Sequence, residues 1–316
     1  MSVIAVDLKT GKITTALFTA EGEILESKKR PLGDLRATQV GRFIRSQIDD
    51  FLHKAKEEYH VRVKAIGISV PGIYYEQSGI VWAPNIPGWR NYPLAEDLKG
   101  YPYPLKIMSD RCCHMLGEHW KGAASGCRNV ICYSVGSGIY AGIMIDGQIL
   151  RGQSNIAGAI GWMGMDKHFE KEYRSCGFLE YHASATGIAR RAIEMAAGDD
   201  AYRGELKERD LNVQDVFNAY KNEDPIAVRV LEEAIRYWGI SIGNLISIFN
   251  PGKIILAGSV FGPAVQFKHQ IYEEAAKWAQ PISMQEVTMD VSFLGTQADL
   301  YGAGRLALIA AEEIRD

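Results

Sequence analysis

The chain has 316 residues, of which 47% are hydrophobic and 23% charged, and its 35 Lys and Arg against 38 Asp and Glu give a formal net charge of −3. This balance is typical of a globular chain with a substantial core, and it excludes disordered and fibrous classes and wide-area nucleic-acid binding. No run of about 18 or more apolar residues is present, and the apolar start of the chain ends at Asp7. We therefore expect no membrane span, no signal peptide and a cytoplasmic protein.

The first 31 residues predict an antiparallel meander. Apolar strands at 3–6 and 13–18 are separated by a turn around Gly11, and a second turn follows at Gly22. Apolar residues at spacings of three and four predict a helix over 40–55, and strands at 63–70 and 104–108 follow.

The middle of the chain repeats this design. A strand at 129–135, the turn Gly136-Ser137-Gly138 and a strand at 139–145 with the hairpin signal Asp146-Gly147 form a second meander. The remaining predicted elements are helices at 181–197, 225–249, 263–279 and 299–314 and strands at 253–257 and 287–293, with the charged stretch 198–210 as a solvated loop. Two meanders, each followed by α/β elements, predict two similar lobes with a cleft between them.

The two hairpin turns, at 7–12 and 136–140, are candidate phosphate-binding sites. Such turns aim backbone N–H groups and hydroxyls at phosphate oxygens, and an aspartate at a strand end, here Asp7, can hold magnesium through water. One such turn is most simply a hairpin, but two at equivalent places favour phosphate binding.

Ser109-Asp110-Arg111 lies between a predicted strand and a predicted helix. Taken alone, Ser109 or Asp110 is best explained as a helix cap. A carboxylate at this junction is also well placed to take a proton from a substrate hydroxyl, so both interpretations stay open.

A series of short motifs runs in order along the chain. They are Gly67-Ile68-Ser69-Val70-Pro71-Gly72, Ala83-Pro84-Asn85-Ile86-Pro87-Gly88-Trp89, Asp110 with Leu116-Gly117-Glu118, Gly136-Ser137-Gly138-Ile139, Asp146-Gly147, Leu150-Arg151-Gly152, Ala157-Gly158, Cys176-Gly177-Phe178-Leu179-Glu180, Asn250-Pro251 and Gly302-Ala303. In this order they resemble the ROK (repressor, open reading frame, kinase) sugar kinases of the actin-like ATPase superfamily, over essentially the whole chain.

The resemblance implies an α/β protein with the actin-like ATPase (ribonuclease H-like) fold, two lobes and a central cleft. We expect a small lobe over 1–117 joined by the C-terminal helix 299–316, and a larger lobe over 118–298. A homodimer is also implied. The family's repressors carry a helix-turn-helix before the first meander, whereas here a strand begins at Val3, so we expect no nucleic-acid partner.

The resemblance also implies site residues for a small-molecule sugar, ATP and Mg²⁺. Asp110 would be the general base that removes a proton from the sugar hydroxyl attacking the γ-phosphate, and Asp7 would lie near the magnesium, which it holds through water. The sugar would contact Gly72, Asn85, Ser109, Asp110, Glu180 and Trp162, phosphate would contact Lys9, Thr10, Lys12, Gly136, Ser137 and Gly138, and Gly258 and Ser259 would border the adenosine.

The chain departs from the family pattern at both phosphate turns. Lys9, Thr10 and Gly11 stand where the family has Gly-Gly-Thr, which predicts altered phosphate binding with positive charge from Lys9 or Lys12. Tyr140 stands where the family has glycine, and its ring could crowd the nucleotide.

Other departures affect the sugar and zinc sites. Ala159 and Trp162 replace a Glu and a His that contact sugar in the family, so the ligand is expected to be less polar at that edge, differently shaped, or stacked on Trp162. That His and three cysteines form the family's zinc site, whereas here only Cys176 remains. His168 and His182 lack the ligand spacing, so we expect no zinc site. Ser109 replaces an asparagine, and Arg111 adds a charge beside Asp110.

Two functions follow. The first is an ATP-dependent kinase of a sugar or sugar-like hydroxyl compound with Asp110 as base. The alternative is a ROK-fold carbohydrate-binding protein that has lost efficient phosphotransfer, acting as a sensor or performing altered chemistry on a sugar.

Overall fold

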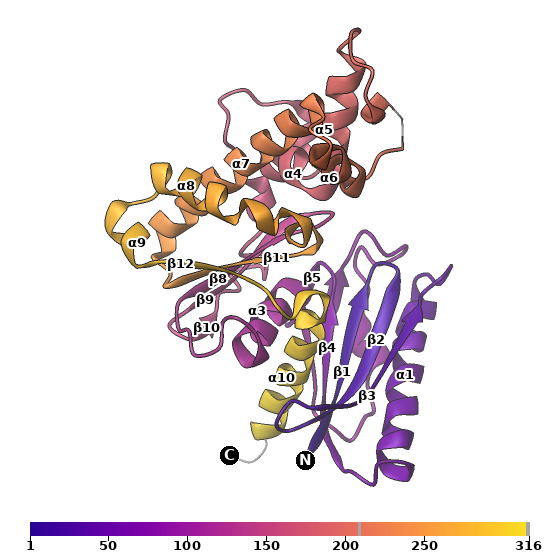
Figure 1. Ribbon diagram of the computed structural model, residues 1–316. Coiled ribbons are helices and arrows are strands. Elements are labelled where there is room, and N and C mark those ends of the chain that lie inside the picture. The colour runs from indigo at the N-terminus through magenta and orange to yellow at the C-terminus, as the bar shows by residue number, and fades with distance from the viewer. Residues whose placement is uncertain (208–209, 314–316) are drawn as a thin grey trace. The chain divides into compact units, whose positions relative to one another are not determined.

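The computed structural model describes residues 1–207 and 210–313. Its internal contacts divide the chain into two units (Figure 1): Met1–Gly126, Ile149–Ala157 and Thr296–Asp316 form the first, and Cys127–Gln148 and Gly158–Gly295 form the second. The boundary expected at residue 117 falls inside helix α3 (Asp110–Lys121), which belongs whole to the first unit. Residues 208–209 of the charged stretch and 314–316 of the expected terminal helix lie outside the described residues.

The first unit is built on a five-stranded sheet with the order β3-β2-β1-β4-β7. Strands β1 (Ser2–Lys9), β2 (Lys12–Thr19) and β3 (Ile24–Pro31) form the predicted antiparallel meander, and β4 (Val63–Val70) and β7 (Leu105–Ser109) extend the sheet in parallel with β1. A small hairpin of β5 (Ile73–Tyr75) and β6 (Ile80–Trp82) and the short helix α2 (Leu94–Asp97) follow β4.

Helices cover both faces of this sheet (Figure 1). Side chains alternate along a strand, so Ile4 and Val6 of β1 pack in the cluster that includes Ile44 of α1 (Thr38–Glu57). Val3 and Ala5 instead pack in the cluster that includes Leu300 and Ala303 of α10 (Ala298–Glu312). The buried strand β1 is thereby fixed from two sides, which holds its carboxyl end in place.

Helices α3 and α10 approach each other unusually closely. A Cβ atom added to Gly302 would lie 1.8 Å from the carbonyl oxygen of Cys113, and one added to Gly117 would lie 2.0 Å from that of Ala298. Only glycine permits this contact. Two glycines of the family-like motifs therefore serve helix packing.

The second unit repeats the topology of the first. Its sheet has the order β10-β9-β8-β11-β12, and the strands are β8 (Val130–Val135), β9 (Ile139–Ile145), β10 (Gln148–Ile149), β11 (Lys253–Ala257) and β12 (Thr288–Val291). Strand β9 is antiparallel to β8, and β11 and β12 are parallel to it.

Two helices of the second unit differ from the prediction. The helix expected at 181–197 is instead α4 (Phe178–Ala183) and α5 (Ala185–Ala197), because the Ser184 hydroxyl accepts the Gly187 N–H and begins a new helix. The helix expected at 263–279 starts as the 3₁₀ turn η5 (Pro263–Phe267) and continues as α8 (Lys268–Trp278). Helices α6 (Val213–Lys221), α7 (Pro225–Phe249) and α9 (Pro281–Glu286) complete the unit. Its 3₁₀ turns are η1 (Ile160–Trp162), η2 (Lys171–Arg174), η3 (Glu205–Lys207) and η4 (Ser259–Phe261). The turn η6 (Gly295–Gln297) lies where the chain passes from the second unit to the first.

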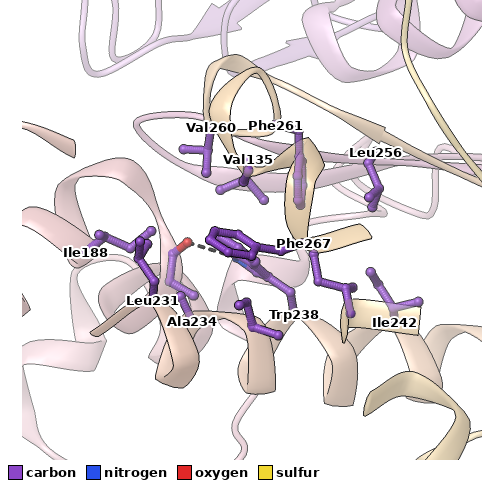
Figure 2. Close-up of a cluster of buried hydrophobic side chains, with 14 of the residues drawn as sticks. Val135, Ile188, Leu231, Ala234, Trp238, Ile242, Leu256, Val260, Phe261 and Phe267 are labelled. Carbon is purple, nitrogen blue, oxygen red and sulfur yellow. Dashed lines mark hydrogen bonds between the residues drawn. The ribbon is translucent and has the colours of Figure 1, made fainter. Parts of the chain in front are cut away.

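Trp238 of α7 lies at the centre of the core of the second unit (Figure 2). Its ring is fully buried and lies near Phe261, with ring centroids 5.2 Å apart, while its indole N–H donates to the Ala183 carbonyl at 3.0 Å. The core thus ties the sheet, α7 and the end of α4 together. Within the described residues, no helix is long and apolar enough to cross a membrane.

Candidate active site

Four polar residues meet at the carboxyl edge of the first sheet. Strands β1, β4 and β7 are parallel, and the register pairs Asp7 with Ser69 and Val70 with Ser109. The carboxyl ends of parallel strands in an open α/β sheet are where ligands commonly bind. This edge therefore collects Asp7, Ser69, Ser109 and, at the start of α3, Asp110.

Asp110 is the first residue of α3, and its Oδ1 accepts the N–H of Arg111 at 2.9 Å. Ser109 makes no side-chain capping bond within the described residues. Burial raises the pKa of Asp110, and the charges of Lys9 and Arg111 oppose that rise. A carboxyl group with a raised pKa is a better proton acceptor than an ordinary one, provided that it is ionised at the working pH.

Arg111 is buried beside this carboxyl group. Its guanidinium donates to the backbone carbonyl of Asn155 at 2.7 Å. Arg111 therefore adjusts the charge at Asp110 and also ties the segment Ile149–Ala157 to α3.

Lys9 connects two buried carboxylates. Its ammonium forms an ion pair with Oδ2 of Asp299 and lies 3.5 Å from Oδ1 of Asp7. Burial raises the pKa of Asp7. The positive charge of Lys9 lowers this pKa, and the negative charge of Asp110 raises it further. The lysine that replaces a family glycine thus lies among the acidic groups of the sheet edge.

His114 completes this group from α3. Its Nδ1 lies 2.8 Å from Oδ1 of Asp299, and burial lowers the pKa of the imidazole to about 3. The ring is therefore neutral at physiological pH, and Nδ1–H donates to the carboxylate. The sequence analysis did not single out His114 or Asp299. The available signals were that Asp299 is an acid in the first turn of the last helix and that His114 lies one turn after Asp110.

The magnesium that the resemblance implies does not fit this arrangement. A metal held through water needs an accessible carboxylate face at Asp7. That face already has the Lys9 ammonium at 3.5 Å from Oδ1. As these side chains lie, a cation of the chain itself occupies the approach to Asp7.

Asn85 is presented by a rigid loop of the first unit. Trp89 is fully buried, stacks on Tyr92 at 4.5 Å and donates its indole N–H to the Ala37 carbonyl. The loop closes on itself through the Ala83 N–H and the Trp89 carbonyl at 2.7 Å, and Asn85 stays exposed. These contacts hold the backbone of the loop on both sides of Asn85.

Gly72, at the end of β4, has a φ of +84°. A Cβ atom there would lie 2.2 Å from the carbonyl oxygen of Trp82. Glycine lets these two backbone segments of the first unit meet.

Thr10 and Lys12 lie at the turn between β1 and β2. Thr10 is exposed, and burial is the main cause that lowers the pKa of Lys12.

The second phosphate turn joins β8 and β9. Glu180 of α4 accepts the Ile139 N–H through Oε2 at 2.8 Å, and a Cβ atom on Gly138 would lie 2.8 Å from that oxygen. Burial raises the pKa of Glu180, and the bond from Ile139 opposes the rise. The predicted sugar residue Glu180 is therefore also a support for the Gly136–Gly138 turn, while Ser137 is exposed.

The same turn lies beside the predicted adenosine residues. Strand β11 pairs in parallel with β8, and Gly258 follows it with a φ of +92°. A Cβ atom on Gly136 would lie 3.6 Å from the Ser259 hydroxyl oxygen. The structure therefore brings Gly136 and Ser259 close together.

Aromatic side chains pack around His182, in the segment where the resemblance led us to consider zinc ligands. Tyr173, Phe178 and His182 pack together, with Phe178 and His182 centroids 4.5 Å apart and the Tyr173 hydroxyl 3.0 Å from Nε2 of His182. Cys176 lies nearby in sequence, but no group of three or more His, Cys, Asp or Glu residues in the described chain is arranged for a metal. His182 is thus engaged in aromatic packing and in a hydrogen bond with Tyr173. Trp162 is 56% exposed, so its ring is available for stacking.

Comparison with known proteins identifies the family of the chain. The sequence profile of the ROK family matches residues 3–310. The chain belongs to the ROK family. Its α/β architecture is the actin-like ATPase fold of ROK kinases.

This ROK protein is similar to both kinases and repressors. It is 31% identical over 313 residues to a glucokinase of Halalkalibacterium halodurans, covering 96% of this chain and 94% of that one. It is 28% identical over 273 residues to a xylose repressor of Caldicellulosiruptor bescii, covering 83% of this chain and 67% of the repressor. Among solved structures, a Streptomyces griseus ROK glucokinase in complex with glucose and AMPPNP superposes with a TM-score of 0.74 at 25% identity, covering 97% of this chain and 99% of that one.

Proposed function

We propose that this ROK protein is an ATP-dependent kinase of a sugar or sugar-like hydroxyl compound. The observation that carries the proposal is Asp110, a carboxylate with a raised pKa at the carboxyl edge of the first sheet. The similarity to glucokinases over nearly the full length supports it. Phosphoryl transfer depends mainly on positioning and charge, which rigid strand ends and turns can supply.

Asp110 acts on the attacking hydroxyl. The sugar oxygen forms a bond to the γ-phosphorus while the bond from that phosphorus to the β,γ-bridging oxygen breaks, and the hydroxyl proton passes to the Asp110 carboxylate. ADP leaves with the bridging oxygen. Asn85 and Glu180 orient sugar hydroxyls, Gly72 leaves room for close backbone approach, and Ser109 and Trp162 complete the sugar contacts.

The turns bind the nucleotide in this proposal. Backbone N–H groups and the hydroxyl of Gly136, Ser137 and Gly138 meet phosphate, Thr10 and Lys12 contribute from the first turn, and Gly258 and Ser259 border the adenosine. The proximity of Gly136 to Ser259 supports this assignment.

The decisive test is a coupled ADP-release assay over a panel of sugars. We expect Asp110→Asn to lower kcat/KM by about 100-fold or more, because general base catalysis contributes about that much. Asp34→Asn, the same chemical change at an exposed residue of the first unit, is the matched control and should leave kcat/KM unchanged. Equal activity of Asp110→Asn and the wild type would remove Asp110 from its role.

A second function is favoured by Lys9. A ROK-fold sugar sensor, or a protein with altered chemistry on a sugar, would tolerate a lysine among the acidic residues where family members have glycine. The similarity to xylose repressors is compatible with this alternative. Titration calorimetry separates the two functions: sugar binding without ATP binding at millimolar concentration would favour the sensor, and firm ATP binding would favour the kinase.

We also propose that the protein forms a homodimer. Light scattering measures the molar mass in solution and checks this prediction.

A further inference from the structure

Two carboxylates from opposite ends of the chain share one ammonium group. Asp7 comes from β1 and Asp299 from the first turn of α10, and both side chains are almost fully buried. The Lys9 ammonium contacts Oδ2 of Asp299 and lies 3.5 Å from Oδ1 of Asp7. Buried carboxylates require a compensating positive charge, and here the chain supplies it.

The histidine that contacts Asp299 does not supply this positive charge. His114 holds the second oxygen of Asp299 at 2.8 Å, but its pKa of about 3 keeps it neutral. The Lys9 ammonium forms its ion pairs with Asp7 and Asp299, and its charge also lowers the pKa of Asp110. Lys9 is therefore the ammonium group shared by Asp7 and Asp299.

We propose that Lys9 is a tethered cation that takes the place of a divalent metal ion at Asp7, and that Asp299 is the positioning residue that holds it there. Mg²⁺ and Mn²⁺ prefer carboxylate and water oxygens, and an ammonium beside Asp7 repels them and blocks their approach. His114 fixes the Asp299 carboxylate by donating to its other oxygen.

This inference rests on the proposed function only for the location of the site. It concerns the group that supplies positive charge there, which is Lys9. Cation occupancy can be measured with neither sugar nor nucleotide present. Failure of the tethered-cation proposal would leave the kinase proposal standing, and the absence of kinase activity would leave the tethered cation standing.

The first experiment measures binding of Mn²⁺ alone to the full-length protein by electron paramagnetic resonance. We expect Lys9→Met to bind one Mn²⁺ at least about 10-fold more tightly than the wild type, because the substitution removes a positive charge next to two carboxylates. Asp7→Asn in the Lys9→Met background should abolish the gain. Lys56→Met removes the same charge at an exposed residue of α1 and should change Mn²⁺ affinity by no more than about twofold.

Two results would overturn the proposal. One is a wild-type protein that binds Mn²⁺ as tightly as Lys9→Met and loses the ion on Asp7→Asn. The other is a folded Lys9→Met protein with no gain in Mn²⁺ affinity.

A second experiment keeps the lysine, in case Lys9→Met leaves two buried carboxylates that prevent folding. The rate of reductive methylation of Lys9 is followed by peptide mass spectrometry, with Lys12 as the internal reference. Asp299→Asn should raise the Lys9 rate several-fold because the amide releases the ammonium, while Asp299→Glu should restore slow reaction. An unchanged Lys9 rate in Asp299→Asn would rule out the positioning role.

Discussion

His114 is kept neutral inside the first unit, so acid should oppose folding through this residue. Burial lowers its pKa to about 3, whereas the unfolded chain has an ordinary histidine value near 6.5. Below about pH 6.5 the unfolded state therefore binds the extra proton, and stability falls as the pH falls toward 3. The contribution is complete above about pH 6.5.

We predict that His114→Asn flattens this part of the pH dependence. Urea unfolding between pH 7.5 and 4.5 should show the wild type losing up to about 1.4 kcal/mol per pH unit more than the variant, since each unit of pKa difference corresponds to that energy. The exposed His53→Asn is the control and should follow the wild type. Parallel curves for wild type and His114→Asn would contradict the assignment.

At this scale, the sequence could indicate Asp7 and Asp110 because each is a carboxylate at a predicted strand end. The salt bridge between Lys9 and Asp299 could not be predicted from the sequence, because it requires that α10, near the end of the chain, packs beside the end of β1. The double role of Glu180 was equally hidden, since the bond to Ile139 requires α4 to lie beside the β8–β9 turn.

Among the elements, α10 and α3 depend on close backbone contact. Gly302 would place a Cβ atom 1.8 Å from the Cys113 carbonyl oxygen, which is backbone and cannot rotate away. The two helices also carry Asp299, His114 and Asp110, so their separation affects the site directly.

We predict that Gly302→Ala destabilises the protein by about 1–3 kcal/mol, the usual cost of overpacking, despite the better helix propensity of alanine. Denaturant unfolding measures the effect. Gly164→Ala is the control, because a Cβ atom there meets nothing within 4 Å, and its stability should stay close to the wild type. A stabilised Gly302→Ala protein would show that the helices separate easily.

Periodicity predicted most elements, and it erred where local hydrogen bonding interrupts a continuous apolar pattern. Ser184 is such a point, because its hydroxyl caps α5 while the apolar spacing continues from α4. At the other helix, the five residues after Gly262 wind as a 3₁₀ turn, a difference in hydrogen bonding that apolar spacing does not resolve.

For the whole molecule, the two sheets share one strand order although the meanders share little sequence beyond their turns. The repeat was visible in the sequence because hairpin glycines mark equivalent turns. The ligand assignments divide at particular residues: Asn85 of the first unit is assigned to the sugar alone, and Gly258 and Ser259 of the second to the nucleotide alone, although each ligand also has assigned residues in the other unit. The two ligands can therefore be perturbed separately.

This division predicts separable ligand effects on thermal stability. At about 100 times its Kd, a ligand adds about 2.7 kcal/mol to the stability of the native state. Asn85→Ala should abolish most of the shift in Tm caused by the best-binding sugar of the panel and keep the shift caused by AMPPNP. Gly258→Ala should do the reverse, because its Cβ atom would lie 2.3 Å from the Val135 carbonyl oxygen and displace the Ser259 segment.

The comparison uses the shift relative to each unliganded variant, so a lower starting Tm of Gly258→Ala does not affect it. Ser259→Ala, which leaves the backbone in place, should weaken the AMPPNP shift in the same direction but less. If Asn85→Ala lost both shifts equally, sugar and nucleotide would not use the residues assigned to them. If the wild type showed a sugar shift and no AMPPNP shift, the sensor function would be favoured over the kinase, because phosphoryl transfer requires both ligands to bind.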